Sequence, residues 1–305
     1  MPKYLHLDSQ QSVFLERELE QVKSRSFDVL KAPLSANRLI PIDSTTSPGA
    51  NVVTYKQFDG NGIAKIISNY ADDLPTVNIE GKSFTSMLKS IGNSFVYSLE
   101  DIRAAMFAGL PLQQRIANQA VRAHQELMNR LAFFGDDEHG IQGWLTNVNI
   151  PSATVVDGED AASEWSTKKP DEILADLTSA KASIITLTKG TETPNTLVLP
   201  LAQYEIIQST ARTGNSDTTI AEFFLRTNPG FTIEYAPELE GAFPGDTDGF
   251  IMYDRSPDKL WQEVPQLVEM FPPQERNLAF TVPVHSKHGG TIIPYPLSMV
   301  FRYGI

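Results

Sequence analysis

The most regular pattern of apolar and polar positions in the chain lies between Leu112 and Phe134. Apolar residues recur there every three or four positions, which predicts one face of a helix of roughly 24 residues, about 36 Å long. Gly135 follows the pattern directly and is expected to end the helix. We expect this helix to be the spine of the fold, with an inward face formed by Leu112, Ile116, Ala120, Ala123, Leu127, Leu131 and Phe134.

A shorter helix is predicted just before the spine. Ser98 can cap its N-terminus, and Asp101, three residues later, completes a capping-box-like pattern. The helix should run to about Ala108, because Gly109 and Pro111 then interrupt the pattern.

Residues 51–97 are prone to form strands but hold too few apolar side chains for a core of their own. Val52–Phe58 alternates weakly like a strand, and Asp59-Gly60-Asn61-Gly62 has strong turn chemistry. Residues 76–84 and 87–97 predict further strands. Two-stranded ribbons are marginally stable alone. We therefore expect this segment to lie on another surface, and a neighbouring subunit is the natural candidate.

Two segments before this ribbon are also poor in apolar residues. Residues 9–30 predict a helix with a thin apolar stripe. Residues 33–50 are rich in proline, serine and threonine, with Leu39-Ile40 and Ile42 as strand-like anchors. They predict an extended arm.

After Trp144 the pattern becomes that of an α/β unit, and strands dominate from Lys259 onward. Pro294 and Pro296 should interrupt the final strand or place it at an edge. The predicted helices are 170–187, 200–209 and 218–226. The predicted strands are 196–199, 231–235, 250–253, 260–264, 267–271, 278–286 and 291–303.

Composition and charge narrow the classes of function. The chain has 305 residues, enough for one elaborate domain or two closely connected ones, and contains no cysteine. Its formal net charge is −12 and it has no long basic run, which argues against sequence-specific nucleic-acid binding. An acidic protein can still enclose nucleic acid, because its charge keeps it from adhering to the cargo. No apolar run approaches the roughly 20 residues that span a membrane.

Few residues suggest chemistry. Asp136-Asp137-Glu138-His139 could bind a divalent ion, but consecutive side chains diverge, so a solvated turn after the spine is the better interpretation. His285 and His288 should lie on opposite faces of a strand, which argues against a shared metal. His124 lacks a second histidine four residues later and is expected to be packed or exposed. We expect no cofactor and no catalytic residue.

The order of these elements resembles a known family. The spine ends in Phe133-Phe134-Gly135, followed by Gly140-Ile141-Gln142-Gly143-Trp144-Leu145-Thr146-Asn147, an α/β insertion and closing strands. This resembles the α+β Hong Kong phage-type capsid fold of tailed-bacteriophage major capsid proteins, which encapsulins share. By this resemblance, residues 1–50 form an N-terminal arm and 51–95 an extended β-ribbon loop. Residues 96–148 and 255–305 form the peripheral domain with the spine helix, and 149–254 form an inserted α/β axial domain.

The resemblance implies a structural protein and not an enzyme. Subunits would assemble into hexamers and pentamers of an icosahedral or prolate shell that encloses a double-stranded DNA phage genome without sequence-specific binding. The protein would be made in the host bacterial cytoplasm and reside in the virion, without contact with a membrane. The resemblance allows separate portal and decoration proteins as further partners, and either a separate scaffolding protein or none. The implied contact residues between subunits are Lys56, Asp59, Ile63, Lys65, Ile66, Asp72, Asp73, Glu80, Lys82 and Phe84.

Two rival functions stay open at the level of sequence. An encapsulin-type nanocompartment would share the fold and hold an enzyme in place of a genome. A metal-dependent hydrolase would use Asp136, Asp137 and His139 as its site.

Overall fold

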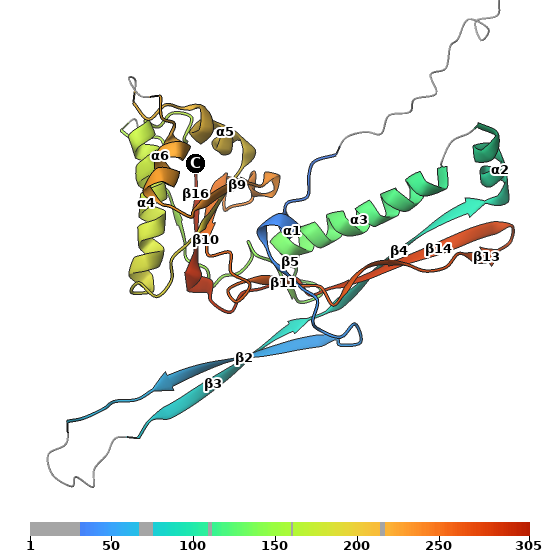
Figure 1. Cartoon of the computed structure of the whole chain (residues 1–305), viewed down its shortest axis with the longest axis horizontal. Coiled ribbons are helices and arrows are strands. Elements are labelled where there is room, and N and C mark those ends of the chain that lie inside the picture. The colour runs from blue at the N-terminus through green and yellow to red at the C-terminus, as the bar shows by residue number, and fades with distance from the viewer. Residues whose placement is uncertain (1–30, 67–75, 109–111, 160, 214–216) are drawn as a thin grey trace, which may run out of the picture. The chain divides into compact units, whose positions relative to one another are not determined.

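The two clearest helical patterns form the helices expected from them. The computed structural model describes residues 31–66, 76–108, 112–159, 161–213 and 217–305, so the helix predicted at 9–30 lies outside the described residues. The spine helix α3 spans Leu112–Phe134, and α2 before it spans Leu99–Ala108 (Figure 1). The Ser98 N–H donates to Asp101 Oδ2 at 2.9 Å, and the Asp101 N–H donates to Ser98 Oγ at 3.1 Å. The predicted capping box is therefore confirmed.

A long antiparallel sheet contacts α3 along its buried face. Its central strand, β14, pairs with β4 over ten residues on one side, and with β13 and then β12 on the other. The sequence did not predict β13, which has only three residues. The strands are β4 (Lys89–Ser98), β12 (Gln266–Met270), β13 (Gln274–Arg276) and β14 (Ala279–His288).

The buried face of α3 is rotated from the predicted one. Its buried residues are Ala120, His124, Met128, Asn129, Leu131, Ala132 and Phe133. Ala123 and Leu127 are exposed, so the prediction is wrong for these two residues. His124 explains the rotation, because its Nδ1 lies 2.8 Å from Ser286 Oγ on β14. A hydrogen bond to the sheet thus brings a polar side chain into an inner position.

A mixed five-stranded sheet forms the second large layer, in the order β7-β16-β10-β8-β9. Its central strands β8 and β10 are short apolar runs and are buried at every position. Helix α4 spans Pro170–Leu187, as predicted, and contributes Ile173, Leu177 and Ile184 to the core beside this sheet. The remaining elements are β7 (Ser152–Thr154), β8 (Thr196–Leu199), α5 (Leu201–Ser209), α6 (Ile220–Thr227), β9 (Thr232–Tyr235), a 3₁₀ turn (Pro237–Leu239), β10 (Gly249–Tyr253) and β16 (Met299–Tyr303). Within the described residues, no helix combines the length and apolar character that a membrane crossing requires.

Part of the segment predicted as an extended arm enters the core. Residues Ala36–Leu39 form the helical turn α1, and Ile42–Asp43 form β1, so the extended prediction is wrong for α1. The Ala36 N–H donates to Asn129 Oδ1 on α3 at 2.8 Å. Strand β1 pairs in parallel with β11 (Trp261–Glu263), which pairs with β15 (Thr291–Ile292). The final strand is interrupted as predicted, because Pro294 and the 3₁₀ turn Pro296–Ser298 separate β15 from β16.

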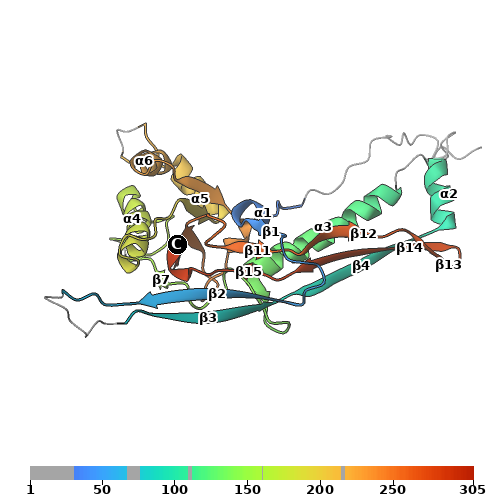
Figure 2. The ribbon, with the colours of Figure 1, turned by 60° about the horizontal axis from the view of Figure 1, so that its bottom comes forward.

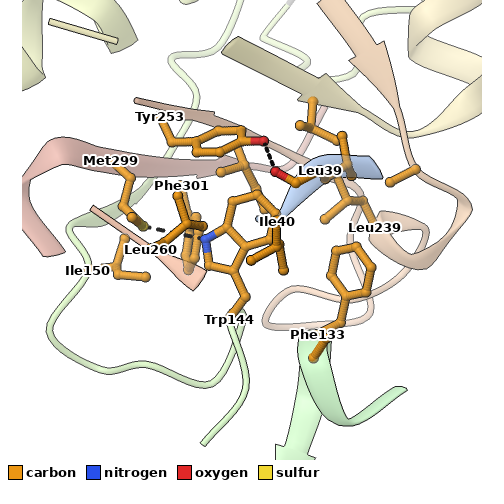
Figure 3. Packing of buried hydrophobic residues seen from close by; sticks show 14 of the residues in the cluster. Leu39, Ile40, Phe133, Trp144, Ile150, Leu239, Tyr253, Leu260, Met299 and Phe301 are labelled. Carbon is orange, nitrogen blue, oxygen red and sulfur yellow. Dashed lines mark hydrogen bonds between the residues drawn. The ribbon is translucent and has the colours of Figure 1, made fainter. Parts of the chain in front are cut away.

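Aromatic packing joins these elements around Trp144 (Figure 3). The Trp144 ring stacks on Phe133 at a centroid distance of 5.9 Å and meets Tyr253 edge-on at 4.7 Å. Tyr253 donates its hydroxyl hydrogen to the Leu39 carbonyl at 2.6 Å. The end of the spine, the five-stranded sheet and the α1 turn thereby share one core.

Candidate interaction surface

Strands β2 (Val52–Asn61) and β3 (Asn78–Met87) form a two-stranded ribbon that extends away from the rest of the fold (Figures 1 and 2). Its strands pair in one unbroken antiparallel register from Val52–Met87 to Asn61–Asn78. Nearly every side chain of the ribbon is exposed. The turn predicted at Asp59-Gly60-Asn61-Gly62 is wrong, because Asp59, Gly60 and Asn61 continue β2 and pair with β3.

The two faces of the ribbon differ in chemistry. On one face, Phe58 and Ile79 are 69% and 68% exposed. A Cβ on Gly81 would lie 3.0 Å from the Phe58 ring, so the absence of a side chain there lets the ring lie across the opposite strand. On the other face, Asp59 and Glu80 are direct cross-strand partners. Like charges placed opposite each other destabilise a strand pair, so the ribbon itself gains nothing from this arrangement.

The base of the ribbon is attached to the rest of the chain through aromatic side chains. Tyr55 and Phe84 stack across the strands at a centroid distance of 5.2 Å, and Tyr55 meets Trp261 of β11 edge-on at 6.3 Å. Burial raises the pKa of the Tyr55 hydroxyl above its usual value. Phe84, one of the predicted contact residues, is therefore partly engaged within its own chain.

The structure brings some of the predicted contact residues together and leaves others apart. Asp59, Glu80 and Lys82 share one face of the ribbon, and Lys56 lies on the opposite face with Phe58. Ile63 and Ile66 follow β2 and are 78% and 101% exposed; Lys65 lies between them and is also exposed. Asp72 and Asp73 lie outside the described residues.

The sequence interpretation overlooked three apolar residues of the ribbon region that are at least two-thirds exposed: Phe58, Val77 and Ile79. Val77, just before β3, is 71% exposed. Strand alternation was the available signal for Phe58 and Ile79. It becomes informative only when the register between the two strands is known.

The acidic cluster after the spine forms a hairpin turn. Strands β5 (Gly135–Asp136) and β6 (Ile141–Gln142) pair, and Asp136 Oδ2 lies 2.8 Å from His139 Nδ1. This hydrogen bond lowers the pKa of the Asp136 carboxyl. Gly135 has a φ of +67°, and a Cβ there would lie 2.3 Å from the Ile141 carbonyl oxygen, so the tight turn requires glycine. The predicted turn is confirmed.

His285 and His288 lie on β14, and His124 lies against it. His124 and His288 are buried, and the Gly290 N–H donates to His288 Nδ1 at 2.9 Å. Burial lowers the pKa of both imidazoles, that of His288 to about 4. Across the residues that the structure describes, no three His, Asp or Glu side chains form a group able to hold a metal ion.

Comparison with known proteins identifies the fold. Three solved structures that resemble the chain are a capsid of Myoviridae phage XM1, a capsid of an empty GTA particle and a virus-like particle from Pyrococcus furiosus. The XM1 chain aligns with a TM-score of 0.83 at 14% identity, covering 96% of this chain and 99% of that one. The GTA chain gives 0.62 at 11% identity, with 93% and 94% covered. The Pyrococcus chain gives 0.52 at 13% identity, with 87% and 90% covered.

These likenesses confirm the α+β phage capsid fold predicted from the order of elements. No curated protein sequence matches the chain. A family model described as major capsid protein matches residues 62–305, which is most of the chain. The protein therefore belongs to the major capsid protein family.

Proposed function

We propose that this chain assembles into hexamers and pentamers of an icosahedral or prolate shell that encloses a double-stranded DNA phage genome. Its role in the virion is structural and not catalytic, and it is made in the host bacterial cytoplasm. Separate scaffolding, portal and decoration proteins complete the set of predicted partners. The division into arm, extended loop, peripheral domain and axial domain is part of this proposal.

One observation carries the proposal: a ribbon of ten paired residues per strand has almost no side chain buried within its own subunit. A free-standing two-stranded ribbon is marginal in water. An exposed, unprotected strand edge also invites pairing with another chain. If the ribbon lies over a neighbouring subunit, that subunit stabilises it and covers its exposed strand edge.

Apolar burial dominates the energy of such a contact. Each exposed ion pair contributes about 0–1 kcal/mol, whereas burying a Phe or Ile side chain contributes about 1.5–3 kcal/mol. Five apolar side chains of the ribbon region are at least two-thirds exposed: Phe58, Ile63, Ile66, Val77 and Ile79. Their burial would contribute on the order of 10 kcal/mol. The charged residues Lys56, Asp59, Lys65, Asp72, Asp73, Glu80 and Lys82 would then mainly select the position of the ribbon on its neighbour.

Shortening the ribbon tests the proposal. Replacing residues 58–81 with Asn-Gly joins Gln57 to Lys82 through a two-residue hairpin turn and keeps their native pairing. The subunit should fold, as judged by circular dichroism and thermal denaturation, but should form no shells in negative-stain electron microscopy. Shells of normal form from the shortened chain would contradict the proposal.

A pair of full-length variants separates the two faces of the ribbon. Phe58→Ser with Ile79→Thr removes the two most exposed apolar side chains of this face and should abolish assembly. Asp59→Asn with Glu80→Gln removes the acidic pair and should leave assembly intact while changing its dependence on salt. If the charge variant alone prevents assembly, apolar burial is not what holds the ribbon in place.

A shell with protein cargo is the second candidate, because the fold is also similar to that of a virus-like particle from Pyrococcus furiosus. The family match favours the phage capsid. Particles purified from the natural source would distinguish the two. Long double-stranded DNA inside supports the capsid, and a stoichiometric enzyme inside supports the compartment.

A further inference from the structure

The turn between β13 and β14 contains a residue that is unusual for its backbone conformation. Arg276 pairs with Ala279, so Asn277 and Leu278 alone form the loop. Their φ angles are +48° and +59°. A two-residue turn with positive φ at both positions strongly favours Asn-Gly. Asn277 fits this preference, but Leu278 occupies the position where glycine is expected.

Leu278 adopts this backbone at a cost, and its side chain gains little burial within its own subunit. A left-handed conformation brings the Cβ of an L-residue too close to its carbonyl oxygen. Among the described residues, four other non-glycine residues have positive φ: Ala161, Lys189, Asp246 and Asn277. Leu278 is the large apolar one, and 72% of it is exposed. A glycine would form the same turn without strain and without exposing an isobutyl group.

The turn lies beside helix α2, as Figures 1 and 2 both show. The Leu99 N–H, the first of the helix, donates to the Leu278 carbonyl at 3.0 Å. The same helix exposes Met106 and Phe107, at 80% and 97%. Val96 on β4 is 55% exposed. Exposed apolar side chains on α2 and β4 thus belong to the same elements that adjoin this strained and exposed leucine.

We propose that Leu278 is a contact residue for a second copy of this chain, at a site separate from the ribbon. This inference rests on the proposed shell function. Backbone strain at an exposed residue is explained if its side chain packs against another molecule.

Charge at this site favours another copy over nucleic acid. Glu275 and Arg276 precede the turn, and Arg103 lies 3.6 Å from Glu100 on α2. A surface with both signs of charge can complement a copy of itself, whereas binding to phosphates needs clustered basic residues. A second subunit of the shell therefore fits this surface better than nucleic acid does.

Two glycine substitutions in the same turn test the proposal. Leu278→Gly and Asn277→Gly each relieve one positive-φ residue, but only Leu278→Gly removes the exposed apolar side chain. For unassembled subunits, the midpoint of thermal denaturation should be unchanged or higher by about 2 °C in both variants. Leu278→Gly should need at least about tenfold more subunit to form shells, as measured by light scattering. Asn277→Gly should assemble like the unmodified chain.

Three outcomes would overturn the proposal. If Leu278→Gly assembles at the normal subunit concentration, the exposed leucine makes no contact, while the shell function stands. A lower denaturation midpoint for Leu278→Gly than for Asn277→Gly would show that the side chain stabilises its own subunit. Unmodified chains that remain monomeric would overturn both this contact and the shell function.

Discussion

Acid should destabilise the subunit through His288, at the end of β14. This imidazole is fully buried, its Nδ1 accepts a hydrogen bond from the Gly290 N–H, and its Nε2 has no hydrogen-bond partner. Protonation would place an unpaired charge in the core. Burial accordingly lowers the pKa of His288 from 6.5 to about 4.

The direction and size of the effect follow from this shift. Histidine in the unfolded chain takes up a proton near pH 6.5, whereas His288 in the folded chain stays neutral down to about pH 4. The unfolded state therefore binds more protons in this interval, and the free energy of unfolding decreases as the pH falls from 6.5 to 4. At about 1.36 kcal/mol per pH unit, the loss is about 2.5 kcal/mol at pH 4.5 and about 3.4 kcal/mol below pH 4.

Urea unfolding of unassembled subunits at pH 7.5 and pH 4.5 would measure this loss. His288→Asn is the informative variant, because its Oδ1 can accept the Gly290 hydrogen bond without titrating. His124 and the carboxyl groups titrate in both proteins, so their contributions cancel in the difference. The variant should lose about 2.5 kcal/mol less than the unmodified chain between the two pH values. Equal losses in the two proteins would refute the reasoning.

Three further substitutions test the internal packing by urea unfolding or hydrogen exchange. Asp176→Asn should lower the free energy of unfolding by about 3 kcal/mol, because Lys168 Nζ lies 2.7 Å from Asp176 Oδ2 and would become a buried charge without a counter-ion. An unchanged free energy of unfolding would show that the lysine is neutral or reaches water. Leu39→Ala should cost about 3 kcal/mol, because Leu39 is fully buried in the core around Trp144; a loss below 1 kcal/mol would mean that α1 is only loosely attached. Ser98→Ala should cost about 1 kcal/mol and speed hydrogen exchange at the Asp101 amide, which loses its capping partner; normal exchange would show that the cap is not formed.

Local signals predicted the helices well. The bounds of α4 agree with the sequence prediction at both ends, because Pro170 occupies its first turn and the apolar spacing continues to Leu187. The capping box at Ser98 likewise requires only residues close in sequence. Features of this kind need no information from distant parts of the chain.

Distant partners explain where the prediction was wrong. Asp59-Gly60-Asn61-Gly62 favours a turn, yet pairing with β3 extends β2 through Asn61. The α1 turn has only four residues and is held by Asn129 of α3 and Tyr253 of β10. The rotation of α3 depends on Ser286, which is 162 positions from His124 in the sequence. Each error concerns a contact that local residue patterns do not encode.

Residues of the proposed contact surface are hard to predict from sequence for a different reason. An apolar residue that contacts a neighbouring subunit has the same sequence pattern as one that packs into its own core. Leu127 lies in the apolar pattern of the spine yet is 39% exposed, and Phe58 alternates like a core residue yet is 69% exposed. The structure shows which apolar side chains remain exposed to solvent in the isolated subunit. The pairing of Asp59 with Glu80 agrees with the proposed contact, because like charges placed opposite each other disfavour the hairpin itself. Leu278 likewise combines a strained backbone with a side chain that its own subunit leaves mostly uncovered. We therefore expect unfavourable features of the isolated subunit to mark where its neighbours bind.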